Sequence, residues 1–133
     1  MDKLISIDTN VIVRFLTEDD QQQFEKAKDL IKKNSIFVPT TVVLETDWVL
    51  RFAYKFKNEK ISKAFSRFFG LPNVIAENAK ALENAIVWSQ AGLEFADALH
   101  LAASQTTQSF ASFDQQLCKR GSSFSSCPLR DLN

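Results

Sequence analysis

The chain has 133 residues, of which 45% are hydrophobic and 24% charged, with only three glycines and three prolines. This composition predicts one ordered globular domain over residues 1–133 and excludes an intrinsically disordered chain, which needs low hydrophobicity and unbalanced charge. Sixteen basic and sixteen acidic residues cancel, so a local basic region, rather than an overall field, would have to meet a polyanionic partner.

The first half of the chain alternates short apolar segments with longer amphipathic ones. Residues 4–7 (LISI) and 35–38 (SIFV) are short and rich in β-branched residues, which predicts buried strands. The segment 19–33 carries its acids early and its lysines late, as the helix dipole favours. Helices are predicted over residues 9–16, 19–33 and 40–56.

The second half continues the alternation. Gly70 and Pro72 end a helix predicted over residues 58–69, and Gly92 is a candidate C-terminal cap for a helix over 77–91. Further predicted elements are strands at 73–76, 109–113 and about 128–132, a helix over 94–107 and a helical turn at 114–119. Strands that alternate with helices predict an α/β fold, with a central, mainly parallel sheet of four to five short strands flanked by helices.

The ends and the cysteines indicate a cytoplasmic protein without a membrane segment. No apolar run approaches the roughly 18 residues of a membrane helix, and the start MDKLISID lacks the apolar region of a secretory signal. Cys118 and Cys127 show no metal-type spacing with the single His100. We therefore expect both cysteines to be reduced.

Four acids occupy positions where chemistry is expected. Asp8 and Asp114 each follow a predicted strand directly, and ligands bind at the carboxyl ends of strands in open parallel sheets. Glu45 shares a helical stripe with Val42, Trp48, Val49 and Phe52.

Asp97 lies between Leu93 and Leu101, each one helical turn away. A carboxylate on an apolar stripe is costly to desolvate unless a cation or a hydrogen-bond donor meets it. If the four acids converged on one divalent cation, its charge would offset the cost of desolvating all of them.

Each acid also has an ordinary structural explanation. Asp8 and Asp114 could cap the helices that follow them, Glu45 could reach solvent, and Asp97 could pair with a basic side chain. An aspartate at the end of a strand can cap a helix and bind a cation at once, so the argument depends on the set.

Four motifs that contain these acids resemble the PIN-domain family, in particular toxins of the VapC type from bacterial type II toxin–antitoxin pairs. The matching segments are Ile7–Phe15 (IDTNVIVRF), Val43–Glu45 (VLE), Phe95–Ala102 (FADALHLA) and Ser112–Asp114 (SFD). The order and spacing of the motifs agree over nearly the whole chain. One departure is Gln116, where many relatives carry a second acid or an asparagine.

The resemblance implies a PIN-like single domain that hydrolyses RNA phosphodiester bonds as an endoribonuclease. Asp8, Glu45, Asp97 and Asp114 would be its catalytic metal ligands, with Thr9, Asn10, Ser112 and Glu94 in supporting roles. Carboxylates with almost no His or Cys nearby favour Mg²⁺ or Mn²⁺ over zinc, and such a metal activates water and stabilises charge on the phosphate. The resemblance further implies a cognate antitoxin as partner and a homodimer.

A basic region lies in the middle of the chain. Between Arg51 and Arg67 there are six basic residues against the single acid Glu59. They form a candidate track for RNA phosphates or, alternatively, a solvated helix face. The RNA-binding candidates are Arg51, Lys55, Lys60, Lys63 and Arg67. We expect most of the aromatic residues among them to be core or interface residues.

Two rival functions stay open. The acidic pocket could belong to a non-catalytic module that receives a basic side chain of a partner, or the metal site could cut DNA, since acids alone do not recognise the 2′-hydroxyl. A receiver domain and an aspartyl phosphatase fit poorly, because the first strand is followed by Asp8 alone and position 10 is asparagine.

Overall fold

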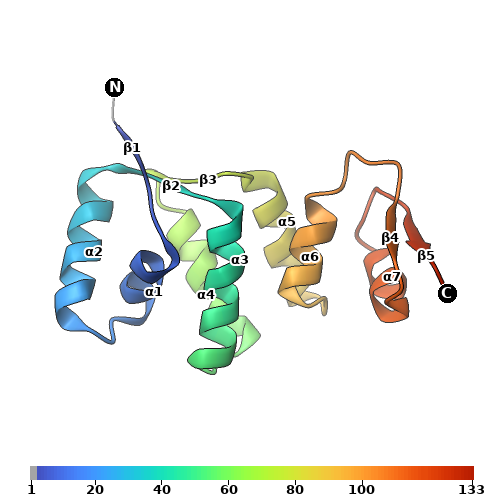
Figure 1. Ribbon diagram of the computed structural model, residues 1–133, viewed down its shortest axis with the longest axis horizontal. Helices are drawn as coiled ribbons and strands as arrows, with labels where there is room; N and C mark the ends of the chain where they lie inside the picture. Colours follow the sequence, from blue (N-terminus) through green and yellow to red (C-terminus); the bar gives the residue numbers. More distant parts are fainter. Residues whose placement is uncertain (1–2) are drawn as a thin grey trace. The chain divides into compact units, whose positions relative to one another are not determined.

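The computed structural model describes residues 3–133, which divide after Glu77 into two compact units (Figure 1). The first unit contains β1 (Leu4–Ser6), α1 (Thr9–Thr17), α2 (Gln21–Lys33), β2 (Ser35–Val38), α3 (Thr40–Trp48), the π-helical turn η1 (Val49–Ala53), α4 (Asn58–Phe69) and β3 (Val74–Ala76). The second unit contains α5 (Ala79–Gln90), α6 (Phe95–Ala102), β4 (Phe110–Ser112), α7 (Gln115–Gly121) and β5 (Leu129–Asp131).

The strands of the first unit form a parallel sheet in the order β1-β2-β3. Ile5 pairs with Ile36, and Phe37 pairs with Ile75. Helices α1 and α2 connect the first two strands, and α3, η1 and α4 connect the second to the third. Because the strands are parallel, the segments after β1, β2 and β3 all leave the same edge of this sheet.

In the second unit β4 and β5 form a separate parallel pair, with Ala111 opposite Arg130. Helix α5 packs against α6, and α7 packs against α6, β4 and β5. The predicted α/β fold with parallel strands is therefore confirmed. Its five short strands form a sheet of three and a sheet of two in the described residues, rather than one sheet of four to five strands.

Several helix boundaries follow from local capping residues. Asp20 accepts the backbone N–H of Gln23 and starts α2 two residues later than the predicted boundary. After α5 the backbone N–H of Leu93 donates to Trp88 O, while that of Gly92 donates to Ser89 O. These two hydrogen bonds form a Schellman motif, and Gly92 supplies the positive φ of 120° that the motif needs. The predicted cap is confirmed.

Two predicted helices have a different form in the structure. The helix predicted over 40–56 is α-helical only to Trp48 and then widens into η1, where the Tyr54 N–H donates to Val49 O. The helix predicted over 94–107 ends at Ala102. Side chains compete for its last carbonyls, since Ser104 donates to His100 O and Gln105 donates to Leu101 O.

Each unit has its own apolar interior. In the first unit, Ile12 of α1 and Phe65 of α4 are fully buried together with Ile36 of the sheet. In the second, Ala85, Ala98 and Leu101 lie at the contact of α5 and α6 or next to it and have no exposed surface. No helix within residues 3–133 is both long enough and apolar enough to cross a lipid bilayer.

Candidate functional site

Two of the predicted acids are joined through one threonine in the first unit. Asp8 follows β1, and its carboxylate accepts the backbone N–H of Thr9 at 2.7 Å as α1 begins. The Thr9 hydroxyl donates to the Glu45 carboxylate on α3, 36 residues further along the chain. Thr9 itself is buried, so this donor is held rigidly. Thr9 thus contacts two of the predicted ligands, and its role in orienting them stays a prediction.

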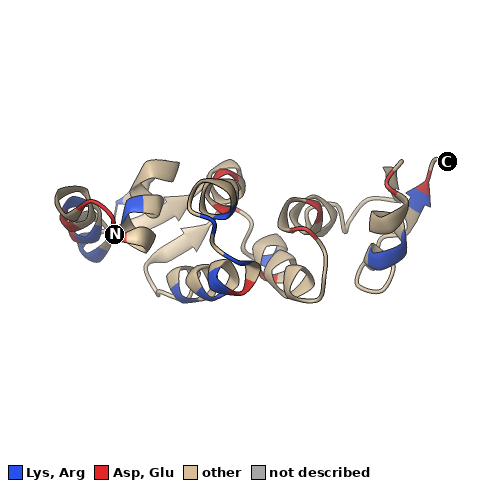
Figure 2. Cartoon of the chain, turned by 90° about the horizontal axis from the view of Figure 1, so that it is seen from below, with Lys and Arg blue, Asp and Glu red and all other residues tan. Residues whose placement is uncertain are grey.

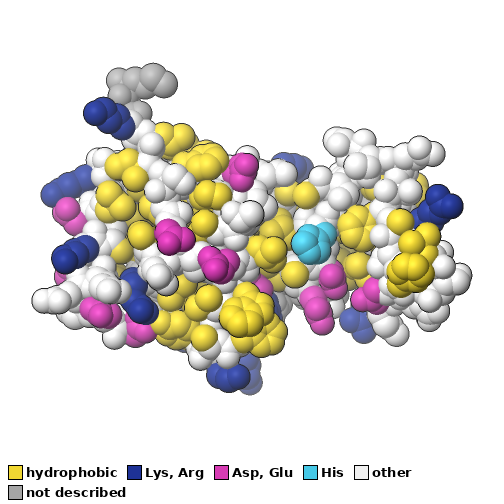
Figure 3. All heavy atoms as spheres, viewed as in Figure 1, with side chains coloured by type: hydrophobic (Ala, Val, Ile, Leu, Met, Phe, Trp, Pro, Cys, Tyr) yellow, Lys and Arg dark blue, Asp and Glu magenta, His cyan; other side chains and the backbone are white. Residues whose placement is uncertain are grey.

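The environment of Glu45 differs from the prediction. The apolar stripe expected around it is not buried, because Trp48 and Phe52 are 59% and 52% exposed and Glu45 is also exposed. Figure 3 shows the resulting hydrophobic patch over the end of α3 and η1. Val43 of α3 and Leu50 of η1 are buried instead. Desolvation is therefore not what makes Glu45 unusual.

The buried acid of α3 is Asp47, which the sequence analysis missed. It is 5% exposed, and its carboxylate pairs with the Arg51 guanidinium at 2.9 Å. Arg51 also donates to the Asn58 side chain. The i,i+4 spacing of Asp47 and Arg51 was the signal that could have revealed the pair. Because this pair engages Arg51, the guanidinium is less available to RNA than the prediction assumed.

A second missed acid lies directly after β3. Glu77 accepts the backbone N–H of Thr40 at 2.9 Å and so caps α3, whose N-cap residue Pro39 makes no side-chain cap bond. Asp8 and Glu77 therefore both follow strands at the carboxyl edge of the three-stranded sheet. The signal was the position of Glu77 after a predicted strand, which is the same signal that selected Asp8.

The other two predicted ligands interact in the second unit. Burial, followed by the charges of Glu94 and Asp114, raises the pKa of the half-buried Asp97, and His100 opposes this effect. Figure 3 shows acidic side chains close to the single histidine of the chain. Asp97 on α6 and Asp114 at the start of α7 thus belong to one acidic group, and Glu94 is part of it.

The supporting residues differ in what they contact. The Ser112 hydroxyl accepts the backbone N–H of Asp114 at 2.9 Å, and Asp114 accepts that of Leu117, so α7 begins with Asp114 fixed. Asn10 is exposed on α1 and lines a hollow with Arg14. Gln116 is exposed on α7.

The donor set fits a hard divalent cation. Within residues 3–133 no Lys or Arg forms an ion pair with Asp8, Glu45, Asp97 or Asp114. Carboxylate oxygens without such partners are the ligands that Mg²⁺ and Mn²⁺ prefer. Among residues 3–133, no group of three or more His, Cys, Asp or Glu is arranged so that it could bind a metal. The convergence of all four predicted ligands on one cation stays a prediction.

The basic candidates other than Arg51 lie on α4 and the segment before it, and Figure 2 shows basic segments along α4. The expectation that the aromatic residues between them are core holds for Phe65 and Phe68, which are buried. Tyr54 and Phe56 are half-buried and line a pocket together with the lysines.

Comparison with known proteins gives one family and two structural likenesses. The model of the PIN domain family matches residues 5–122, and no curated protein sequence matches the chain. Mycobacterium tuberculosis VapC20, described as a Sarcin-Ricin loop cleaving toxin, is 18% identical, with a TM-score of 0.44 over 90% of this chain and 95% of that one. VapBC2 from Rickettsia felis, solved bound to a DNA fragment from its promoter, is 15% identical, with a TM-score of 0.40 over 98% and 100%.

Proposed function

Because this chain belongs to the PIN-domain family, whose model covers most of both units, we propose that it is a metal-dependent endoribonuclease and the toxin of a toxin–antitoxin pair. Its metal ligands are Asp8, Glu45, Asp97 and Asp114, all of which lie within the matched residues 5–122. The cofactor is Mg²⁺ or Mn²⁺, and the natural partner is a cognate antitoxin. A homodimer and a cytoplasmic location complete the proposal.

One observation carries this proposal: within residues 3–133, no Lys or Arg forms an ion pair with any of these four carboxylates, which lie far apart in the chain. The Thr9 hydroxyl donates to Glu45 beside Asp8, and the charges of Glu94 and Asp114 act on Asp97. An acidic group with no Lys or Arg to balance it gains from a divalent cation.

Bound there, the cation would supply an activated water and stabilise charge on the displaced phosphate. The residues of the chain do the positioning. Thr9 holds the Glu45 carboxylate through its hydroxyl, and the Ser112 hydroxyl fixes the backbone of Asp114. Carboxylates held in this way would need little reorganisation to receive the cation.

The test uses the full chain and two matched oligonucleotides of the same sequence, one RNA and one DNA. We expect Mg²⁺ or Mn²⁺ to support cleavage of the RNA, EDTA to abolish it, and excess Mg²⁺ to restore it. Cleavage that resists EDTA would refute the metal site. Equal cleavage of the DNA would instead favour the alternative of a nuclease that acts on DNA.

A binding measurement distinguishes the alternative function, a non-catalytic binding module, from the nuclease. A peptide with Lys or Arg at its end would bind the acidic group of such a module, and Mg²⁺ would compete with it, while no RNA would be cut under any metal condition. We expect cleavage together with competition, because the same acids would serve both ligands.

A further inference from the structure

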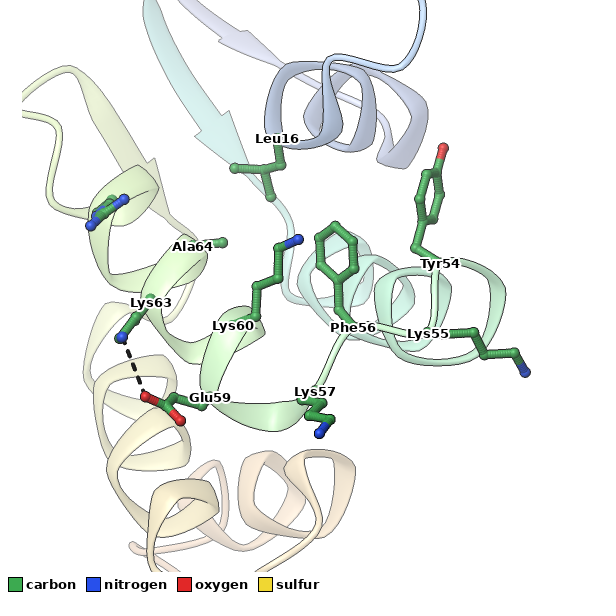
Figure 4. Close-up of a pocket in the computed structure, with 10 residues that line it drawn as sticks. Leu16, Tyr54, Lys55, Phe56, Lys57, Glu59, Lys60, Lys63 and Ala64 are labelled. Atoms are coloured by element: carbon green, nitrogen blue, oxygen red, sulfur yellow. Dashed lines mark ion pairs between the residues drawn. The ribbon is translucent and has the colours of Figure 1, made fainter.

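A pocket in the first unit, apart from the proposed metal ligands, combines aromatic rings with basic side chains. It has a volume of about 680 Å³ and lies between α1, residues 54–57 and α4. Five of its ten lining residues are basic and only one is acidic. Figure 4 shows this pocket. The lining residues are Leu16, Tyr54, Lys55, Phe56, Lys57, Glu59, Lys60, Lys63, Ala64 and Arg67.

The single acid of this pocket does not neutralise it. Glu59 pairs with Lys63 at 3.3 Å, and both of these side chains are well exposed. Within residues 3–133 no ion pair involves Lys55, Lys60 or Arg67. In a chain whose total charge is zero, this pocket is thus a place where positive charge is left locally unbalanced.

One of the cations is aimed into the pocket by a ring. The Lys60 ammonium lies 3.8 Å from the centre of the Phe56 ring, a cation–π contact. In Figure 4 Lys60 extends into the space between Leu16 and Phe56, whereas Lys55 and Lys57 point away from it. Phe56 thereby restricts the position of the Lys60 ammonium, whereas a surface lysine without such a contact would move freely.

The segment that carries the ring is itself fixed. Lys55 has a positive φ of 58°, a conformation that non-glycine residues adopt only when their surroundings impose it. The Phe56 N–H donates to Leu50 O at 2.9 Å, and the Tyr54 hydroxyl donates to Asp19 at 2.6 Å. Strained backbone next to a π-helical turn is a combination that often marks functional sites.

We propose that this pocket binds the backbone phosphates of single-stranded RNA, with Lys60 and Arg67 as the phosphate-binding residues and Phe56 as the residue that positions Lys60. The inference rests on the proposed function in taking RNA as the polyanion. Lys60 and Arg67 are seven residues apart on α4, about 10 Å along the helix axis, which spans more than a single phosphate group. The pocket would therefore hold a length of strand.

The test measures RNA binding without cleavage. A fluorescently labelled single-stranded RNA oligomer is titrated with the full chain in EDTA, and anisotropy gives the Kd over a range of salt concentrations. For a single strand, each lost phosphate contact reduces the salt slope, which is the steepness of log Kd against log salt concentration, by about 0.7. At 0.1 M salt this corresponds to a loss of affinity of about fivefold. We expect Lys60→Gln and Arg67→Gln each to show this loss.

Lys26→Gln is the matched control, because Lys26 is an exposed lysine of α2 outside the pocket and the charge change is identical. We expect it to leave the Kd and the salt slope unchanged. An equal loss in Lys26→Gln would overturn the proposal, since RNA would then respond to total charge alone.

The positioning role of Phe56 is tested by a double-mutant cycle. Phe56→Leu keeps an apolar side chain but removes the ring, and we expect binding to weaken about two- to fivefold. In the Lys60→Gln background the same change should have no further effect, and Phe56→Trp should retain binding. Additive losses would show that Phe56 contacts RNA independently and would refute the positioning role.

Two further outcomes are decisive. A polyglutamate peptide with as many charges as the RNA should bind at least tenfold more weakly; equal binding would assign the pocket to an acidic protein. Because the titration contains no metal, its result is independent of the acid centre. Weaker RNA binding in Lys60→Gln, together with no RNA cleavage by the unmodified chain in any metal, would support the pocket and refute the nuclease. Metal-dependent cleavage, together with unchanged RNA binding in Lys60→Gln, would refute the pocket alone.

Discussion

Two carboxylates, one in each unit, have opposite surroundings. In the first unit, hydrogen bonds from Tyr54 and Thr17 are the main reason why the pKa of Asp19 is lowered. In the second unit, burial and the neighbouring acids raise the pKa of Asp97. Hydrogen-bond donors stabilise the charged form of Asp19, whereas the charged form of Asp97 would be stabilised by a bound cation or removed by protonation. The contrast separates a carboxylate whose charge is already stabilised by donors from one whose charge a cation would stabilise.

The largest effect expected from this contrast is the loss of cleavage in Asp97→Asn. Because burial and the charges of Glu94 and Asp114 raise the pKa of Asp97, removing its charge relieves repulsion in the metal-free fold. We expect RNA cleavage to fall to background while the melting temperature in EDTA does not fall. A marked drop of that melting temperature would give Asp97 a structural role and erase the contrast.

Removing the donor of the first unit should have the next largest effect. Thr9→Val keeps the shape of the side chain but cannot donate to Glu45. Loss of such an orienting contact typically costs 10–100-fold in metal affinity or activity, and we expect a loss of that size in the steady-state cleavage rate. Thr9→Ser restores the hydroxyl and should recover most of the rate. Equal rates in the valine and serine variants would contradict the orienting role.

Asp47 offers the matched case of a purely structural acid. Asp47→Asn breaks the ion pair with Arg51, of which the carboxylate side is nearly buried. We expect unfolding in urea to show a loss of about 1–3 kcal/mol, with unchanged cleavage per folded molecule. An Asp47→Asn protein that is stable but inactive would place Asp47 among the functional acids and reverse its assignment.

The smallest effect concerns pH. Because the pKa of Asp19 is lowered in the folded chain, its contribution to stability is present above the pKa of the unfolded chain and is lost as the pH falls through the lowered value. Tyr54→Phe removes the hydrogen bond that lowers the pKa of Asp19 most. The variant should therefore be less stable than the unmodified chain at pH 7, and this difference in the free energy of unfolding should shrink below about pH 4. Urea midpoints at several pH values measure it. In an Asp19→Asn background the deficit should no longer depend on pH.

Local signals in the sequence predicted much of the fold. Gly92 marked the end of α5 and Gly70 that of α4, because a positive φ or a chain reversal depends on residues that lie next to each other. Similarly, the alternation of short apolar and longer amphipathic segments was enough to indicate parallel strands connected by helices. The match of the PIN family model confirms the family that the four motifs indicated.

The environment of the acids was less accessible to sequence reasoning. The stripe of Trp48 and Phe52 was expected to be buried from its hydrophobicity, yet α3 buries Asp47 instead, because Arg51 balances its charge. Such an exchange depends on a pair of residues rather than on the hydropathy of either. The role of each residue of the pocket on α4 likewise depends on how a ring and an ammonium meet in space.

The wide turn η1 also bears on how the length of this chain can change during evolution. Its Tyr54 N–H bonds to Val49 O across five residues, and with one residue fewer the same two groups would close an ordinary α turn. A deletion within α4 would instead rotate every later side chain by about 100° and move Phe68 out of the core. Insertions and deletions of one residue among descendants should therefore accumulate at residues 49–53.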